Sequence, residues 1–172
     1  MNNKLNLFSR ITNIIWYILL IITAVFFFLG MSFYFKGTNE ISRISLFEIQ
    51  LEPENSLIPY FIPMAFITWS FVIYGFFLFK KLIHQFKKRL FFTDFAIQTL
   101  KRIGYVLIAY TFLNSIIKNI LEHLVEQQTN IRNSDYTLSP FIYPLLLGFF
   151  FIILSEVFKV AKITKQENDL TI

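Results

Sequence analysis

The sequence contains no cysteine, which excludes disulfide bonds, thiolate metal sites and a cysteine nucleophile. Charged residues are also scarce: they form 16% of the 172 residues, whereas an ordinary soluble domain has about 25%. Hydrophobic residues make up 55%, and the 23 Phe are spread through long uncharged runs, as in helices that face acyl chains. The composition therefore predicts one integral membrane domain over residues 1–172.

Four apolar runs approach or exceed the roughly 20 residues that a helix needs to cross about 30 Å of hydrocarbon. We expect an all-α fold, a bundle of four transmembrane helices that span residues 11–35, 56–79, 103–121 and 137–157. The first run is too long for a cleavable signal peptide and lacks a small-residue cleavage site. The third is the weakest, because it is interrupted at Lys118, which must snorkel or face protein.

The basic residues predict the orientation of these helices. Of the 16 Lys and Arg residues, 12 lie before the first run, between the second and third, or after the fourth. The positive-inside rule places these segments in the cytoplasm, with both termini, a loop over residues 80–102 and a tail over residues 158–172. We expect location in a cytoplasmic (inner) membrane. Since topology accounts for the positive charge, we expect no direct binding of nucleic acid.

The two halves of the chain share a faint pattern. Pro59-Tyr-Phe-Ile-Pro63 opens the second run, Pro140-Phe-Ile-Tyr-Pro144 opens the fourth, and an Arg-Ile pair precedes each odd run. One interpretation is a tandem repeat of a helical hairpin, with the two copies related by an axis along the membrane normal. The other is that proline favours first helical turns and arginine favours the cytoplasmic boundary. Both remain open.

The end of the third run carries the most informative polar residues. Asn114, Lys118 and Glu122 recur every four residues, and Ser115 begins the adjoining row. These residues predict either a polar path for an ion or solute, or a helix that leaves the membrane near Lys118 and is solvated beyond it. We favour the solvated face, because snorkelling is sufficient for a lysine at the membrane boundary.

The sequence shows no recognisable metal-binding, phosphate-binding or catalytic motif. The two histidines, His84 and His123, are expected on opposite sides of the membrane, and a solvated helical face explains Glu122, His123 and Glu126 better than a metal site does. The sequence contains no phosphate-binding glycine loop, nucleophile elbow or kinase signature. We therefore expect no cofactor and no enzymatic activity.

The middle loop and the tail contain the remaining candidates. Thr93 or Asp94 is expected to cap the helix that leads into the third run. The basic stretch around Lys87 predicts a docking surface for anionic lipid or protein, or simply a topology signal. Glu156 is expected to form an interfacial ion pair with Lys159, Arg102 or Lys101. The fourth helix is expected to continue into the tail. The carboxylate that follows Asp169-Leu-Thr-Ile172 either binds in a groove of a partner or belongs to a frayed end.

Two stretches carry a family resemblance. Phe92-Thr93 with Leu100-Lys-Arg-Ile-Gly104, and Glu156-Val-Phe158 with Glu167-Asn-Asp-Leu-Thr-Ile172, resemble a family of small four-helix bacterial membrane proteins known as domain of unknown function 2975. Members of that family are often encoded beside a small helix-turn-helix regulator. The resemblance implies a regulatory or stress-linked membrane role and no chemistry.

We predict a regulatory or partner-binding membrane module that acts through its cytoplasmic loop and tail. Its expected partners are the lipid bilayer and a cytoplasmic or membrane protein, and homo-oligomerisation is left open. A small transport or channel subunit, with a path along Asn114, Ser115, Lys118 and Glu122, is the alternative. The residues expected at the partner surface are Lys87, Lys88, Arg89, Phe92, Thr93, Arg102, Glu156, Asp169, Leu170, Thr171 and Ile172.

Overall fold

A computed structural model describes residues 2–36, 44–46, 49–51, 58–129 and 139–170. Four helices account for nearly all of them: α1 (Asn2–Lys36), α2 (Ile58–Lys87), α3 (Asp94–Thr129) and α4 (Ser139–Leu170). Between α1 and α2, β1 (Ile44–Leu46) pairs antiparallel with β2 (Ile49–Leu51), with Ser45 opposite Gln50. The predicted helical fold is confirmed, and this short hairpin is an addition that the sequence pattern did not indicate.

All four helices are long and apolar enough to cross a membrane. They contain 30 to 36 residues, which corresponds to about 45–54 Å at 1.5 Å per residue. The hydrocarbon core of a bilayer is about 30 Å thick. Each helix is therefore long enough to continue by several turns outside a bilayer.

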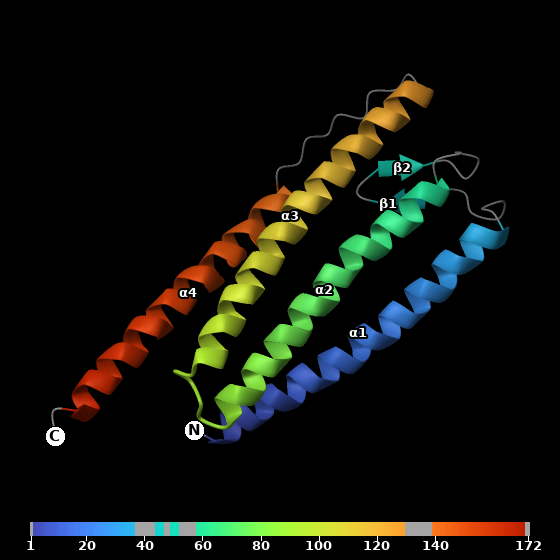
Figure 1. The fold of residues 1–172 in the computed structure, drawn as a ribbon. Helices are drawn as coiled ribbons and strands as arrows, with labels where there is room; N and C mark the ends of the chain where they lie inside the picture. The colour runs from blue at the N-terminus through green and yellow to red at the C-terminus, as the bar shows by residue number, and fades with distance from the viewer. Residues whose placement is uncertain (1, 37–43, 47–48, 52–57, 130–138, 171–172) are drawn as a thin grey trace.

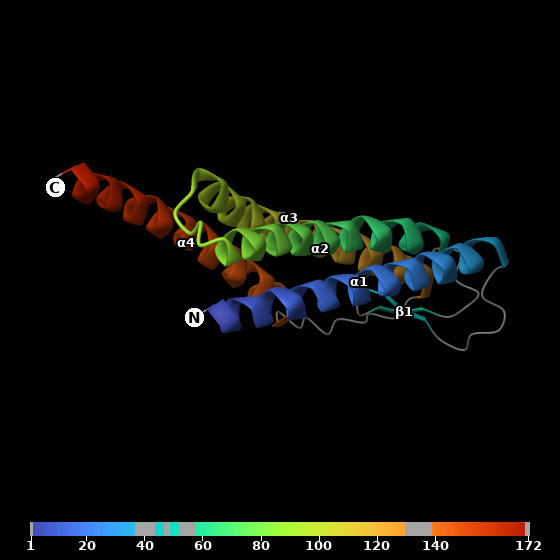
Figure 2. The same cartoon turned by 90° about the horizontal axis from the view of Figure 1, so that it is seen from below.

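The helices form a row in chain order, in which α1 packs on α2, α2 on α3 and α3 on α4 (Figure 1). Helices α1 and α4 thus occupy opposite edges, so the array is more open than the expected bundle. Seen from below, α1 and α4 slope in opposite directions, so the row of helices is twisted (Figure 2). We call the end that holds the N-terminus, the α2–α3 connection and the C-terminal turns of α4 the basic end.

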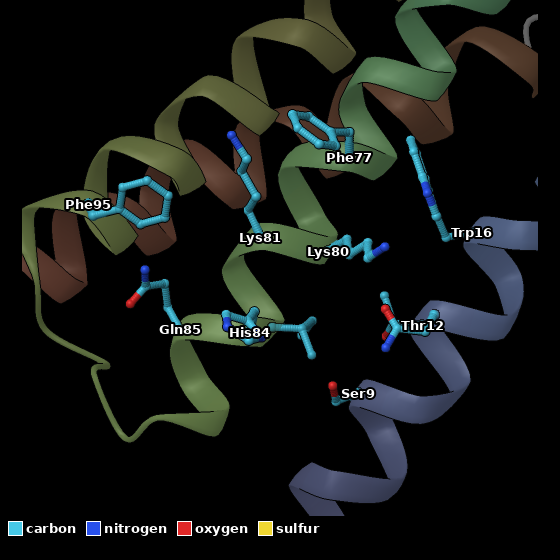
Figure 3. A pocket seen from close by; sticks show the side chains of 11 residues that line it. Ser9, Thr12, Trp16, Phe77, Lys80, Lys81, His84, Gln85 and Phe95 are labelled. Carbon is cyan, nitrogen blue, oxygen red and sulfur yellow. The ribbon is translucent and has the colours of Figure 1, made fainter. Parts of the chain in front are cut away.

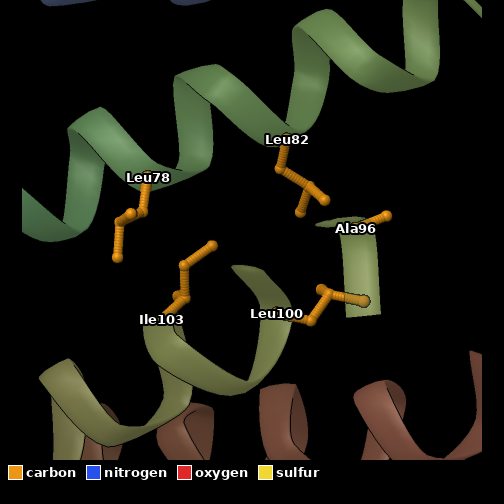
Figure 4. Packing of buried hydrophobic residues seen from close by; sticks show 5 residues of the cluster. All are labelled: Leu78, Leu82, Ala96, Leu100 and Ile103. Atoms are coloured by element: carbon orange, nitrogen blue, oxygen red, sulfur yellow. The ribbon is translucent and has the colours of Figure 1, made fainter. Parts of the chain in front are cut away.

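The buried core lies close to the basic end, where α2 and α3 face each other (Figure 4). Leu82, Ala96 and Leu100 are almost fully buried there, and α4 covers them with partly buried residues such as Leu154 and Phe158. All three buried residues belong to segment 80–102, the predicted loop, in which a helix was expected to start at Thr93 or Asp94. Helix α2 continues past residue 79 to Lys87, and α3 begins at Asp94, as the predicted cap implies.

Two helix pairs are held together in different ways. At the α3–α4 crossing, Gly104 and Gly148 face each other so closely that a Cβ added to Gly104 would lie 2.6 Å from the Gly148 carbonyl oxygen. In the α1–α2 pair, aromatic rings fill the contact, and Trp69 donates a hydrogen bond of 3.0 Å from Nε1 to the Thr23 hydroxyl. Small residues allow backbones to approach closely where no hydrophobic effect drives association.

The paired prolines occupy matched positions in the even helices. Pro59 and Pro63 are the second and sixth residues of α2, and Pro140 and Pro144 are the second and sixth residues of α4. A proline in the first turn of a helix removes no intrahelical hydrogen bond, because its amide would have no partner there. A proline at the sixth position removes one such hydrogen bond. This correspondence is compatible with both interpretations of the pattern, so the duplication stays a prediction.

Candidate functional site

The connection between α2 and α3 is short and tightly ordered by backbone hydrogen bonds. The Leu90 amide donates to the Gln85 carbonyl at 3.2 Å, and the Arg89 amide donates to the Phe86 carbonyl at 3.0 Å. This is the pattern of a Schellman cap, in which one residue adopts a left-handed conformation. Arg89 takes that role with a φ of 62°, although glycine is the usual residue there. The connection therefore presents the Arg89 side chain from a fixed backbone position.

Thr93 caps the start of α3, as the sequence predicted. Its hydroxyl oxygen accepts a hydrogen bond of 3.2 Å from the Ala96 amide, which would otherwise lack an intrahelical partner. Next to it, the ring of Phe92 meets the ring of Phe158 edge to face, with centroids 5.4 Å apart. Phe86 also contacts Phe158, at 6.0 Å. An aromatic cluster thus fixes the connection to the side of α4.

Polar contacts join the same stretch of α4 to the start of α3. The Ser155 side chain is fully buried and donates a hydrogen bond of 2.9 Å to the Ile97 carbonyl. Lys162 lies 2.6 Å from the Asp94 carboxylate. Glu156 pairs with Lys101 at 3.6 Å and Lys159 at 3.9 Å, two of its three predicted partners. These contacts hold α4 in a defined register against α3.

The structure brings some of the predicted partner residues together and separates others. Lys87, Lys88 and Arg89 are exposed at the α2–α3 connection, and Phe92, Thr93 and Glu156 lie around the aromatic cluster. Arg102, the residue after Lys101 on α3, is exposed. Asp169 is exposed near the end of α4, which extends past the connection (Figure 1), and Leu170 ends that helix. Thr171 and Ile172 lie outside the described residues.

The projecting part of α4 carries an exposed apolar stripe. Val157, Val160 and Ile163 are 54%, 62% and 46% exposed, and the charged residues Lys159 and Lys162 lie between them in the sequence. Every residue from Ile163 to Asp169 is exposed. We call residues 157–170 of α4 the α4 arm. The sequence predicted this helical extension, but not that Phe158 and Lys162 contact the start of α3 while Val157, Val160 and Ile163 stay exposed, because that division depends on tertiary packing.

A groove of about 380 Å³ lies across α2 at the basic end, between α1 and the start of α3 (Figure 3). Its α1 wall contains Ser9, Thr12, Asn13 and Trp16, and its α2 surface contains basic side chains. Sequence reasoning missed it, because residues near positions 12 and 80 meet only when α1 and α2 pack. The available signals were the Trp16-Tyr17 pair and the Lys80-Lys81 pair at the ends of their apolar runs. The lining residues are Ser9, Thr12, Asn13, Trp16, Phe77, Lys80, Lys81, Ile83, His84, Gln85 and Phe95.

Lys118 lies towards the other end of the array and is buried, with an exposed fraction of 6%. Its ammonium group is 3.8 Å from the Glu122 carboxylate and 5.4 Å from the centre of the Phe141 ring on α4. Leu121 beyond it is fully buried. Lys118 therefore faces protein, one of the two positions that the sequence left open for it, while His123 beyond it is exposed, as a solvated face requires. Asn114 and Ser115 are partly buried on the same helix.

The structure also bears on metal binding. Within the described part of the chain, no three His, Asp or Glu side chains converge on a point. The Glu126 side chain, part of the weighed Glu122, His123 and Glu126 set, lies outside the described side chains.

Comparison with known proteins gives one relationship. No curated protein and no solved structure matches the chain. A family model described as "Protein of unknown function (DUF2975)" matches residues 48–172, which include α2, α3, α4 and β2. The resemblance noted in the loop and tail is thereby confirmed, and the chain belongs to this family.

Proposed function

We propose that the protein spans a bacterial cytoplasmic membrane four times, with the basic end in the cytoplasm, and acts there as a regulatory module that binds a protein partner. The distribution of charge supports the orientation: 12 of the 16 Lys and Arg residues belong to the segments at this end.

The α4 arm is the observation that carries the proposal of partner binding. A helix that leaves a bilayer has no lipid to cover its apolar residues, yet Val157, Val160 and Ile163 are exposed along it. Exposed apolar stripes on projecting helices are the features by which a partner helix is recognised. Lys159 and Lys165 flank the stripe with positive charge, so the partner surface is expected to be an apolar helix bordered by acidic residues.

Cysteine labelling tests the orientation, since the native chain contains no cysteine that would react. A Lys88→Cys variant places a thiol on the exposed α2–α3 connection, and His123→Cys places one on an exposed position of α3 at the far end. A membrane-impermeant maleimide should label His123→Cys in intact cells and Lys88→Cys only after permeabilisation. The reverse pattern would refute the orientation, and labelling of both in intact cells would refute the topology.

Site-specific photocrosslinking tests the partner. A photoreactive residue at position 160 should give a discrete protein adduct in native membranes, while the same residue at Ile153, exposed two turns earlier on α4, serves as the matched control. The adduct should disappear when a Val157→Glu substitution is added to the chain that carries the photoreactive residue at position 160. If deletion of residues 167–172 together with neutralisation of Lys87, Lys88 and Arg89 changes neither the adduct nor any associated phenotype, we would abandon the proposal.

A transport or channel subunit is the second candidate, and the burial of Lys118 favours it. Lys118 of α3 is buried against the Phe141 ring of α4, and a buried ionisable group within a membrane-spanning helix is costly and often lines an ion or solute path. Purified protein in liposomes should then carry a flux that Lys118→Ala reduces. Unaltered flux in that variant would rule out a path along Lys118. Absence of flux from the wild-type protein would rule out a transport or channel function.

A further inference from the structure

We infer that the groove between α1 and α2 binds the headgroup of an anionic phospholipid from the leaflet at the basic end. The inference requires that the chain spans a membrane, but it does not depend on a protein partner. Figure 3 shows the groove with Lys80 extending from α2 towards α1, and with Lys81 on the side where Phe95 of α3 lies.

The charges in the groove are unbalanced. Lys80, Lys81 and His84 line it, and none of its described lining residues is acidic. Elsewhere at the basic end, Lys101, Lys159 and Lys162 are each close to a carboxylate. The described residues place no carboxylate within ion-pair distance of Lys80 or Lys81, so these two ammonium groups remain available for an anion.

Aromatic rings hold the two lysines in place. The Lys80 ammonium lies 5.3 Å from the centre of the Trp16 ring and 5.8 Å from that of Tyr17. The Lys81 ammonium lies 4.4 Å from the centre of the Phe77 ring. Cation–π contacts orient an ammonium group without neutralising its charge. The two ammonium groups are thus preorganised to bind a phosphate.

The polarity of the groove changes along its length, which favours a lipid over a soluble anion. Trp16 stacks with Phe76 and meets Phe77 at 5.9 Å, on the side towards the membrane-spanning runs. Ser9 and Asn13 of α1 and His84 and Gln85 of α2 lie further out, because the two helices are antiparallel. A phosphate held by Lys80 beside α1, with Lys81 adding positive charge from the side of α3 and acyl chains along Trp16 and Phe77, matches this gradient.

Quenching of tryptophan fluorescence tests the inference, because Trp16 lies in the groove and the chain has only one other tryptophan, Trp69. The full-length protein in nanodiscs should be quenched at a low mole fraction of brominated phosphatidylglycerol and not at the same fraction of brominated phosphatidylcholine. Excess unlabelled phosphatidylglycerol should reverse the effect, whereas glycerol 3-phosphate should not. Equal quenching by the two lipids would overturn the inference, and reversal by glycerol 3-phosphate would show a soluble-anion site instead.

A pair of matched variants separates the groove from general surface charge. Lys80→Gln/Lys81→Gln should weaken the preference for the anionic lipid roughly tenfold. Lys87→Gln/Lys88→Gln removes the same charge from exposed positions at the same end and should weaken it less than about twofold. Lys80→Arg/Lys81→Arg should keep the preference, and circular dichroism of all variants checks that the helices form. An equal loss in the two glutamine pairs would refute a specific site.

Discussion

The contact of Gly104 with Gly148 gives the sharpest test of the packing. In a Gly104→Ala variant the new Cβ would lie 2.6 Å from the Gly148 carbonyl oxygen, and 3.2 Å from the Ile152 backbone nitrogen. An ordinary carbon–oxygen contact is about 3.3 Å, so the two backbones would have to separate by about 0.7 Å. Overpacking of this kind costs about 1–3 kcal/mol, and alanine recovers up to about 1 kcal/mol of helix propensity. We expect a net loss of about 1 kcal/mol.

Gly75→Ala is the matched control for this substitution. Its Cβ would meet only Val106 Cγ1, at 3.5 Å, which is an ordinary contact between α2 and α3. The helix-propensity gain is then unopposed, and we expect a change between zero and about 1 kcal/mol in the stabilising direction. Unfolding in mixed micelles with increasing SDS, followed by circular dichroism, measures both variants. If Gly104→Ala is as stable as Gly75→Ala, the described α3–α4 crossing is wrong.

Substitutions at three further positions probe the basic end, and all are measured by the same unfolding assay. Thr93→Ala should cost about 1 kcal/mol because it removes the cap on the Ala96 amide, while Thr93→Ser should restore most of it; equal values would refute the cap. Ser155→Ala should cost about 1 kcal/mol through loss of the buried bond to Ile97, and an unchanged stability would show that this bond contributes nothing. Arg89→Gly should stabilise by up to about 1 kcal/mol, because it relieves a left-handed conformation, and Arg89→Val should destabilise; the opposite order would contradict the turn geometry.

The local features of the basic end were predictable from sequence because they depend on neighbouring residues. Thr93 caps α3 through an amide three residues away, and Glu156 pairs with Lys159 on the same helix. The extent of the helices in segment 80–102 was harder to predict. The cap at Thr93 indicated where α3 begins, but the lysines after residue 79 gave no sign that α2 continues to Lys87, since charged side chains on a helix can point to water while Leu82 is buried.

The features that depend on distant residues were the ones missed. Burial of Lys118 requires Phe141, which is 23 positions away on another helix, and the groove requires Trp16 to meet Phe77. Neither pairing leaves a periodic signal in either helix alone. Hydrophobic periodicity is also weak in these helices, because apolar residues face lipid as well as protein, so the pattern did not indicate which side of α3 faces α4.

The two kinds of helix contact imply that the interfaces between neighbouring helices differ in stability. The α3–α4 pair combines a backbone crossing, the Ser155 hydrogen bond and ion pairs, whereas α1 is held to α2 by aromatic contacts and one described side-chain hydrogen bond from Trp69. Such a bond averages about 0.6 kcal/mol within membranes, and an aromatic pair contributes about 0.5–1.5 kcal/mol. The α1–α2 interface is therefore the easier one to open. The groove bridges this interface, so a phospholipid bound there would stabilise the chain by linking its most weakly attached helix to the core.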